Sequence, residues 1–152
     1  MKKRIAVFPG SFDPFTVGHQ DIVLRALPMF DEIIIAVGEN SQKKYMKSLE
    51  DRLNYIRAVF KNEPKVSADS FNGLTVTYCK TVNAGFLLRG IRNTTDFEYE
   101  RNIANMNREI EPEIETVFLM CSPQHIAVSS TIVREIIKHG GDASKFLPLN
   151  DL

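Results

Sequence analysis

Several features that would assign a protein to a class at once are missing from these 152 residues. No apolar run approaches the roughly 20 residues that a membrane-spanning helix needs. The charges balance, with 19 lysines and arginines against 19 acidic residues, which argues against a general polyanion binder such as a nucleic-acid-binding protein. Cys79 and Cys121 lack the spacing of a metal or redox site. We therefore expect no membrane partner and no nucleic-acid partner.

The compartment follows from two further absences. The basic start, Lys2-Lys3-Arg4, leads into only a few apolar residues before Pro9-Gly10, which is too short for a signal peptide. The low cysteine content gives no sign of a disulfide framework. We therefore expect a reducing, cytoplasmic setting.

Familiar catalytic signatures are absent as well. The chain has neither the glycine fingerprint of dinucleotide-binding domains nor a P-loop, and it has no Gly-x-Ser-x-Gly elbow. Cys121 and His125 could be drawn as a catalytic pair, but nothing nearby orients the histidine, and Cys121 ends an apolar strand. No protein residues have metal-cage spacing, so any Mg²⁺ would be held mainly by substrate phosphates and water.

Short apolar segments alternate with helical patterns along the chain. The 43% apolar content is enough for one core, so residues 1–152 are expected to form a single domain. The expected strands are Arg4–Phe8, Glu32–Val37, Lys65–Ala68, Phe86–Leu88 and Thr116–Met120. Because near-continuous apolar strands alternate with helices, the sequence predicts an α/β fold with a Rossmann-like, doubly wound, five-stranded parallel sheet.

Five helices are expected from apolar residues that recur at helical spacing. The second has Ser48 as a candidate N-cap, and the last stops at Gly140-Gly141, a normal helix end. Leu74–Thr81 is a short third helix. The faces that define the other four are Ile22, Val23, Ala26, Leu27 and Phe30; Leu49, Leu53, Ile56 and Phe60; Tyr99, Ile103, Met106 and Ile110; and Ile132, Val133, Ile136 and Ile137.

Polar residues gather where the predicted strands end, which is where ligands of such sheets bind. Ser11 to His19 follow the first strand, and Lys43 and Lys44 follow the second. Arg89 and Arg92 are expected after the fourth strand, and Ser129 to Thr131 follow the fifth and open the last helix. A cationic, hydroxyl-rich cleft without a protein nucleophile suits direct phosphoryl or nucleotidyl transfer, in which the substrate supplies the nucleophile.

His19 and the two arginines each have an ordinary structural explanation beside the functional one. His19 could simply face water at a helix start. However, Gly18 precedes it, and the N–H groups of a helix N-terminus gather there, which favours a role in holding phosphate. Arg89 and Arg92 around Gly90 could form a solvated turn or a bidentate phosphate clamp.

The remaining polar residues are open to the same two interpretations. Lys43 and Lys44 could be a solvated pair. Ser129 to Thr131 could serve simply as a helix cap, or the same hydroxyls could also hold a nucleotide phosphate. The acidic turn from Asp96 to Glu100 could serve the helix dipole alone, or one carboxylate could bind a ribose or an amino group.

From end to end, the chain resembles the bacterial phosphopantetheine adenylyltransferases. They belong to the nucleotidyltransferase superfamily that carries a (His/Thr)-x-Gly-His motif. Thr16-Val17-Gly18-His19 and Ser129-Ser130-Thr131-x-x-Arg134 match the superfamily as a whole. Arg89-Gly90-Ile91-Arg92 and Asp96-Phe97-Glu98-Tyr99-Glu100, together with the short length, single out this branch.

The resemblance implies that ATP and 4′-phosphopantetheine react to give 3′-dephospho-CoA and pyrophosphate with the help of Mg²⁺. This is the penultimate step of coenzyme A synthesis. The acceptor phosphate is already ionised near neutral pH, so the reaction needs no general base. The resemblance further implies a homohexamer, and coenzyme A as a feedback ligand.

Residue roles follow from the same resemblance. His19, Lys43 and Arg92 would be catalytic, with His19 and Arg92 stabilising phosphate charge in the transition state and Lys43 bridging the acceptor phosphate and the α-phosphate of ATP. Ser11, Lys43, Thr75 and Arg89 would bind phosphopantetheine. The ATP site would be Ser11, Phe12, His19, Gly90, Ile91, Arg92, Glu100, His125, Ile126, Ala127, Val128, Ser129, Ser130 and Thr131.

Two positions depart from the family pattern. Ser11 stands where many members have threonine, and His125 stands where an aromatic residue such as tryptophan is often found. Three other functions remain alternatives: a related nucleotidyltransferase acting on nicotinamide mononucleotide or glycerol phosphate, a nucleotide-sensing module without turnover, and an RNA-binding fragment related to tRNA synthetases. The last lacks the basic surface it would need.

Overall fold

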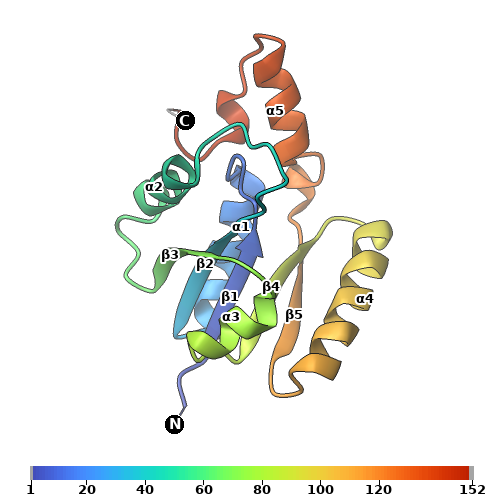
Figure 1. Cartoon of the computed structure of the whole chain (residues 1–152). Helices are drawn as coiled ribbons and strands as arrows, with labels where there is room; N and C mark the ends of the chain where they lie inside the picture. The colour runs from blue at the N-terminus through green and yellow to red at the C-terminus, as the bar shows by residue number, and fades with distance from the viewer. Residues whose placement is uncertain (1, 151–152) are drawn as a thin grey trace.

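The computed structural model describes residues 2–150 and contains one parallel sheet flanked by helices (Figure 1). The strands are β1 (Ile5–Gly10), β2 (Glu32–Gly38), β3 (Val66–Phe71), β4 (Phe86–Ile91) and β5 (Glu115–Met120). The helices are α1 (Val17–Ala26), α2 (Leu49–Val59), α3 (Thr75–Thr81), α4 (Thr94–Ile110) and α5 (Ser130–Lys138). Short 3₁₀ turns cover Leu27–Met29, Pro123–His125 and Ser144–Phe146.

The strand order is β3-β2-β1-β4-β5, with every neighbouring pair parallel. The chain therefore builds outward from β1 to β3 and then returns to the other side of β1 to begin β4. This reversal leaves a crevice between the carboxyl ends of β1 and β4, the usual ligand site of such sheets. The predicted α/β, doubly wound, five-stranded fold is confirmed.

Each face of the sheet has its own apolar core, because alternate strand residues point to opposite sides. On one face, Ile22 and Val23 of α1 and Leu53 and Ile56 of α2 pack against β1 and β2. On the other face, the core includes Val76 and Cys79 of α3, with Val7 and Leu87 from β1 and β4. Val133 of α5 packs on Ala143 and Leu147 in a third, small cluster.

Helix α4 stands apart from this packing. The segment with Tyr99, Ile103, Met106 and Ile110 is helical, as predicted. These four residues are 68, 39, 62 and 46% exposed, and α4 has no buried residue. Figure 1 shows α4 along the side of the sheet beyond β4 and β5. The spacing of these apolar residues thus indicates a helix with an outward apolar stripe and not a helix that contributes to the core.

Three strands end two or more residues later than the sequence predicts. The third strand, β3, continues past Ala68 to Phe71, because its pairing with β2 extends to the Gly38–Phe71 pair. Pro9 and Gly10 belong to β1, where they lie opposite Ala36 and Val37, because the pairing with β2 continues past Phe8. The expectation that Arg89 follows the fourth strand was wrong, because pairing of β4 with β5 continues to the Ile91–Met120 pair. Arg89 therefore extends from the sheet itself. Within residues 2–150, the structure has no helix long and apolar enough to cross a membrane.

Candidate active site

A cavity of about 360 Å³ opens at the crevice between the ends of β1 and β4. Its walls come from four places in the sequence: the β1–α1 loop, the β2–α2 segment, the end of β4 with the start of α4, and the start of α5. Twelve of the predicted site residues line it, namely Ser11, Phe12, His19, Lys43, Arg89, Gly90, Arg92, Glu100, Val128, Ser129, Ser130 and Thr131. The grouping of polar residues at the strand ends is confirmed.

His19 sits in the first turn of α1, held by a reciprocal cap with Thr16. The Thr16 hydroxyl accepts from the backbone N–H of His19 at 3.4 Å, and the backbone N–H of Thr16 donates to Nδ1 of His19 at 3.0 Å. Because Nδ1 accepts this bond, the ring proton of neutral His19 is on Nε2. His19 therefore reaches the cavity wall with one nitrogen fixed and the other a donor.

The surroundings of His19 oppose a positive charge on it. Its ring packs against Phe8, Phe12 and Phe15, with centroid distances of 6.2, 5.0 and 5.3 Å. Burial, and to a smaller extent the charges of Arg89 and Arg92, lower the pKa of His19 to about 3. In the free protein at neutral pH, His19 is thus a neutral hydrogen-bond donor.

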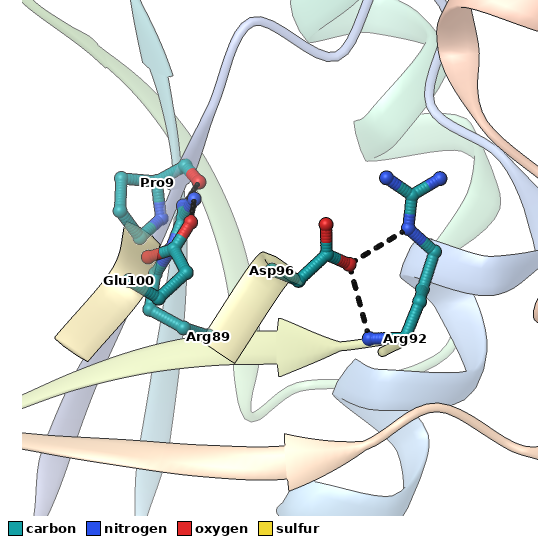
Figure 2. A network of polar contacts seen from close by, with 5 residues as sticks. All are labelled: Pro9, Arg89, Arg92, Asp96 and Glu100. Carbon is teal, nitrogen blue, oxygen red and sulfur yellow. Dashed lines mark hydrogen bonds and ion pairs between the residues drawn. The ribbon is translucent and has the colours of Figure 1, made fainter. Parts of the chain in front are cut away.

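The two arginines are each held by a carboxylate of α4, one helical turn apart (Figure 2). Both carboxylate oxygens of Glu100 accept from one edge of the Arg89 guanidinium, with Nε–Oε2 at 2.9 Å and Nη2–Oε1 at 2.6 Å, and Nη1 of Arg89 donates to the Pro9 carbonyl at 2.6 Å. Asp96 Oδ2 accepts from Nε of Arg92 at 3.0 Å and from its backbone N–H at 3.1 Å. Figure 2 shows the terminal nitrogens of Arg92 pointing away from Asp96, so they remain able to donate.

Lys43 reaches the cavity from the exposed segment between β2 and α2. Its Nζ lies 3.4 Å from the Ser11 hydroxyl, which brings the first two predicted phosphate-binding regions together. Lys43, Arg89, Arg92 and Arg134 give the cavity four cations, against the carboxylates of Asp96 and Glu100. The expected cationic character of the site is present despite the neutral overall charge.

A second cavity of about 250 Å³ adjoins the first. It extends toward α3 and the outer part of α4, and Thr75, Ile103 and Asn107 line it. The two cavities share five lining residues, which are Pro9, Gly10, Ser11, Arg89 and Glu100. Two different ligands could therefore meet beside Ser11 and Arg89. An added Cβ at Gly10 would lie 2.8 Å from the Phe12 ring, so any larger residue at this junction would displace that ring.

The start of α5 closes the opposite side of the larger cavity. Ser129 caps the helix by accepting from the Ile132 N–H at 3.2 Å. The Ser130 hydroxyl donates to the Pro14 carbonyl at 2.8 Å, so it joins α5 to the β1–α1 loop. Arg134 donates to the Asp13 carbonyl at 2.8 Å and to the Thr131 hydroxyl at 3.2 Å.

Five predicted site residues do not line the larger cavity. Thr75 belongs to the smaller one, and Ile91 is buried in β4. His125, Ile126 and Ala127 lie in and after the 3₁₀ turn that precedes α5; of these, Ile126 is 48% exposed. The Cβ of His125 lies 3.9 Å from where a Cβ on Gly18 would be, so this turn is near the α1 N-terminus.

Sequence reasoning missed several residues of this region. In the sequence, Asp96 is only one residue of an acidic turn, and Arg134 is only one residue of a motif. The sequence gives no sign that the side chains of Asp13 and Arg52 are buried, and arginines on helices usually face water. Cys121 lines the cavity, where burial raises the pKa of its thiol, so a catalytic thiolate is disfavoured there.

The positions of carboxylates, histidines and cysteines show whether side chains alone could hold a metal ion. In residues 2–150, the structure has no group of three such side chains that could hold a metal ion. The two carboxylates of the cavity, Asp96 and Glu100, are each paired with an arginine. A divalent ion there would need its other ligands from phosphates and water.

Comparison with known sequences gives one consistent family. The protein-family model described as Cytidylyltransferase-like matches residues 7–136 of this chain. A phosphopantetheine adenylyltransferase of Flavobacterium psychrophilum is 54% identical over 145 residues, which are 95% of this chain and 95% of that protein. Another, from Christiangramia forsetii, is 53% identical and covers 97% of this chain and 96% of that protein.

Solved structures extend the likeness to the fold. A putative nicotinate-nucleotide adenylyltransferase from Vibrio parahaemolyticus has a TM-score of 0.70 at 20% identity, over 96% of this chain and 94% of that chain. A bifunctional NMN adenylyltransferase/ADP ribose pyrophosphatase from Francisella tularensis has a TM-score of 0.71 at 17% identity. The match covers 99% of this chain and 46% of that longer one.

Proposed function

The chain belongs to the phosphopantetheine adenylyltransferase family, and we infer that it transfers the adenylyl group of ATP to 4′-phosphopantetheine. The products are 3′-dephospho-CoA and pyrophosphate, and the step is the penultimate one of coenzyme A synthesis. The observation that best supports this function is the pair of adjoining cavities that share Ser11 and Arg89. One cavity suits the triphosphate and nucleoside of ATP, and the other suits the arm of the acceptor.

In the proposed reaction, an oxygen of the acceptor phosphate attacks the α-phosphorus of ATP. A new P–O bond forms there, the bond from the α-phosphorus to the bridging oxygen breaks, and pyrophosphate leaves with the electron pair. The attacking oxygen is already ionised at neutral pH, so no proton has to be removed from it. Neutral His19 fits this scheme, because it is not poised as a base and can donate a hydrogen bond to developing charge.

Three of the four cations of the cavity have distinct parts in this scheme. Arg92 offers its terminal nitrogens to the phosphates of ATP, while Asp96 fixes the inner edge of its guanidinium. Lys43, beside Ser11, bridges the acceptor phosphate and the α-phosphate. Arg89 binds the acceptor from the shared wall, and Glu100 keeps its plane in one orientation.

The ends of the two substrates occupy the outer parts of the cavities. The backbone and hydroxyls from Ser129 to Thr131, with the preceding segment from His125, would hold ATP. Thr75 in the smaller cavity would contact phosphopantetheine. Mg²⁺ would be held mainly by the substrate phosphates, where it would offset their negative charge.

The remaining parts of the proposal concern regulation, assembly and location. Coenzyme A contains both a pantetheine arm and an adenylyl group, so it would span both cavities as a feedback ligand. The exposed apolar stripe of α4 supports association between copies of this chain, and the proposed assembly is a homohexamer in which another copy covers this helix. We propose one nucleotidyltransferase domain over residues 1–152, acting in the cytoplasm.

A panel of acceptors tests the proposed function directly. With ATP and Mg²⁺, the purified protein should release pyrophosphate when 4′-phosphopantetheine is added and form dephospho-CoA, identified by mass spectrometry. Nicotinamide mononucleotide and glycerol phosphate should give no product. Turnover with either of these but not with phosphopantetheine would leave only the superfamily assignment. Tight ATP binding with no turnover on any acceptor would instead favour a nucleotide-sensing module.

A further inference from the structure

The buried carboxylate of Asp13 has no part in the reaction described above. Asp13 lies two residues after Ser11 in the β1–α1 loop and is 3% exposed. Burying a carboxylate is unfavourable by several kcal/mol unless its oxygens are hydrogen bonded. Both oxygens accept from a different segment of the chain: Oδ2 from the Met46 N–H at 2.7 Å, and Oδ1 from the Lys47 N–H at 3.0 Å.

Met46 and Lys47 belong to the segment that carries Lys43. This segment, residues 39–48, joins β2 to α2 without helix or strand, and Lys43 is exposed on it. Its upstream end is tied to the sheet by the Glu39 N–H, which donates to a carbonyl of β3 at 2.9 Å. Asp13 ties the downstream end, three residues after Lys43.

Arg52 of α2 contacts both the same segment and the loop that carries Ser11. Its side chain is 4% exposed, and Nη1 donates to the Ser11 carbonyl at 2.7 Å. The Tyr45 ring lies over its guanidinium at 4.0 Å. Asp13 reaches from the Ser11 loop to the lysine segment, and Arg52 reaches back to Ser11, so the two loops are held together at two points.

We propose that Asp13 is a positioning residue for Lys43, fixing the backbone of residues 39–48 so that the ammonium group stays beside Ser11. A lysine has a long, flexible side chain, so it holds a point charge in place only if its backbone is fixed. A carboxylate suits this role because it can only accept hydrogen bonds, and two N–H groups face it. The inference rests on the proposed role of Lys43 in adenylyl transfer.

Asp13→Asn tests this role while nearly preserving side-chain shape. The amide would turn an NH₂ toward one of the two N–H groups, so one hydrogen bond is lost and the segment is released. We expect kcat to fall about 10–100-fold, with the KM for ATP within about threefold of the wild-type value. The matched control is Asp142→Asn, because Asp142 also accepts a backbone N–H, from Ser144 at 2.9 Å, in an exposed turn outside both cavities. It should keep wild-type kcat.

A double-mutant cycle separates positioning from a general structural effect. If Asp13 acts through Lys43, the Asp13→Asn/Lys43→Ala protein should be within about twofold of Lys43→Ala alone. Losses that multiply, or a wild-type kcat in Asp13→Asn, would overturn the proposal. A wild-type protein without any adenylyl transfer would instead overturn the proposed function and not the hydrogen-bonding role of Asp13.

Hydrogen exchange of the unmodified protein provides a measurement that does not depend on folding of the variant. The amides of Met46 and Lys47 should exchange at least about 100-fold more slowly than in an unstructured chain, because Asp13 accepts both of them. Exchange at the unstructured rate would show that Asp13 does not hold the segment, and would overturn the proposal.

Discussion

The neutral state of His19 predicts that the protein loses stability in mild acid. Its pKa falls from 6.5 to about 3 on folding, mainly through burial, so between these values the unfolded chain binds a proton that the folded chain does not. The free energy of unfolding therefore falls as pH decreases below 6.5, by up to about 1.4 kcal/mol per pH unit. At pH 5 the loss from His19 is up to about 2 kcal/mol, and above pH 8 this contribution is constant.

The matched variant is His19→Gln, which has an amide of similar reach but no group that titrates in this range. Urea unfolding of both proteins, followed by circular dichroism between pH 8 and pH 5, gives the two pH dependences. The wild-type protein should lose up to about 2 kcal/mol more than the variant.

The same reasoning fixes the result that would refute it. Equal pH dependences for wild type and His19→Gln would mean that the folded and unfolded chains bind the same number of protons at His19. An NMR titration of the His19 ring with a midpoint near 6.5 would have the same meaning. Either result would remove the conclusion that His19 is a neutral donor in the free protein.

Three further predictions concern the arginines, their carboxylate partners and the assembly. Arg89→Ala should raise the KM for phosphopantetheine about 10–100-fold, whereas Arg92→Ala should lower kcat about 10²–10³-fold. Steady-state kinetics that assign both losses to the same substrate would contradict this division. Glu100→Gln should lower kcat/KM for phosphopantetheine about tenfold, because it removes the charged partner that orients Arg89; an unchanged value would show that the pair is not needed. Met106→Glu, on the exposed stripe of α4, should shift the mass seen by light scattering from hexamer to smaller species, and a wild-type protein that is monomeric at micromolar concentration would exclude the hexamer.

Much of the fold was predictable because it depends on local patterns. All five strands and all five helices were identified from apolar periodicity, and Ser48 and Ser129 cap the helices that follow them. The ends of β1, β3 and β4 were placed too early, because residues 9–10, 69–71 and 89–91 are held in strands by partners far away in the sequence. Periodicity likewise identified α4 as a helix but could not show that its apolar side faces outward.

The site was predictable to a similar extent. The positions of His19, Lys43 and Arg92 after strands were enough to bring them to one edge of the sheet. Their chemical states were not predictable, because these depend on neighbours from other elements. The aromatic surroundings of His19 set its pKa, and the segment that carries Lys43 is held by Asp13, more than 30 positions away.

The most direct test of the central claim, direct transfer between two bound phosphates, is isotope exchange between labelled pyrophosphate and ATP. The candidate carriers of an adenylyl group in the cavity are each disfavoured: the lone pair on Nδ1 of His19 accepts from the Thr16 N–H, Asp96 and Glu100 are paired with arginines, and burial raises the pKa of the Cys121 thiol. Both substrates must therefore be present for the bond to form or break. With Mg²⁺ and ATP but no second substrate, the protein should incorporate no label into ATP, and adding dephospho-CoA and phosphopantetheine should start the exchange. Exchange with ATP alone would reveal an adenylylated protein and contradict direct transfer.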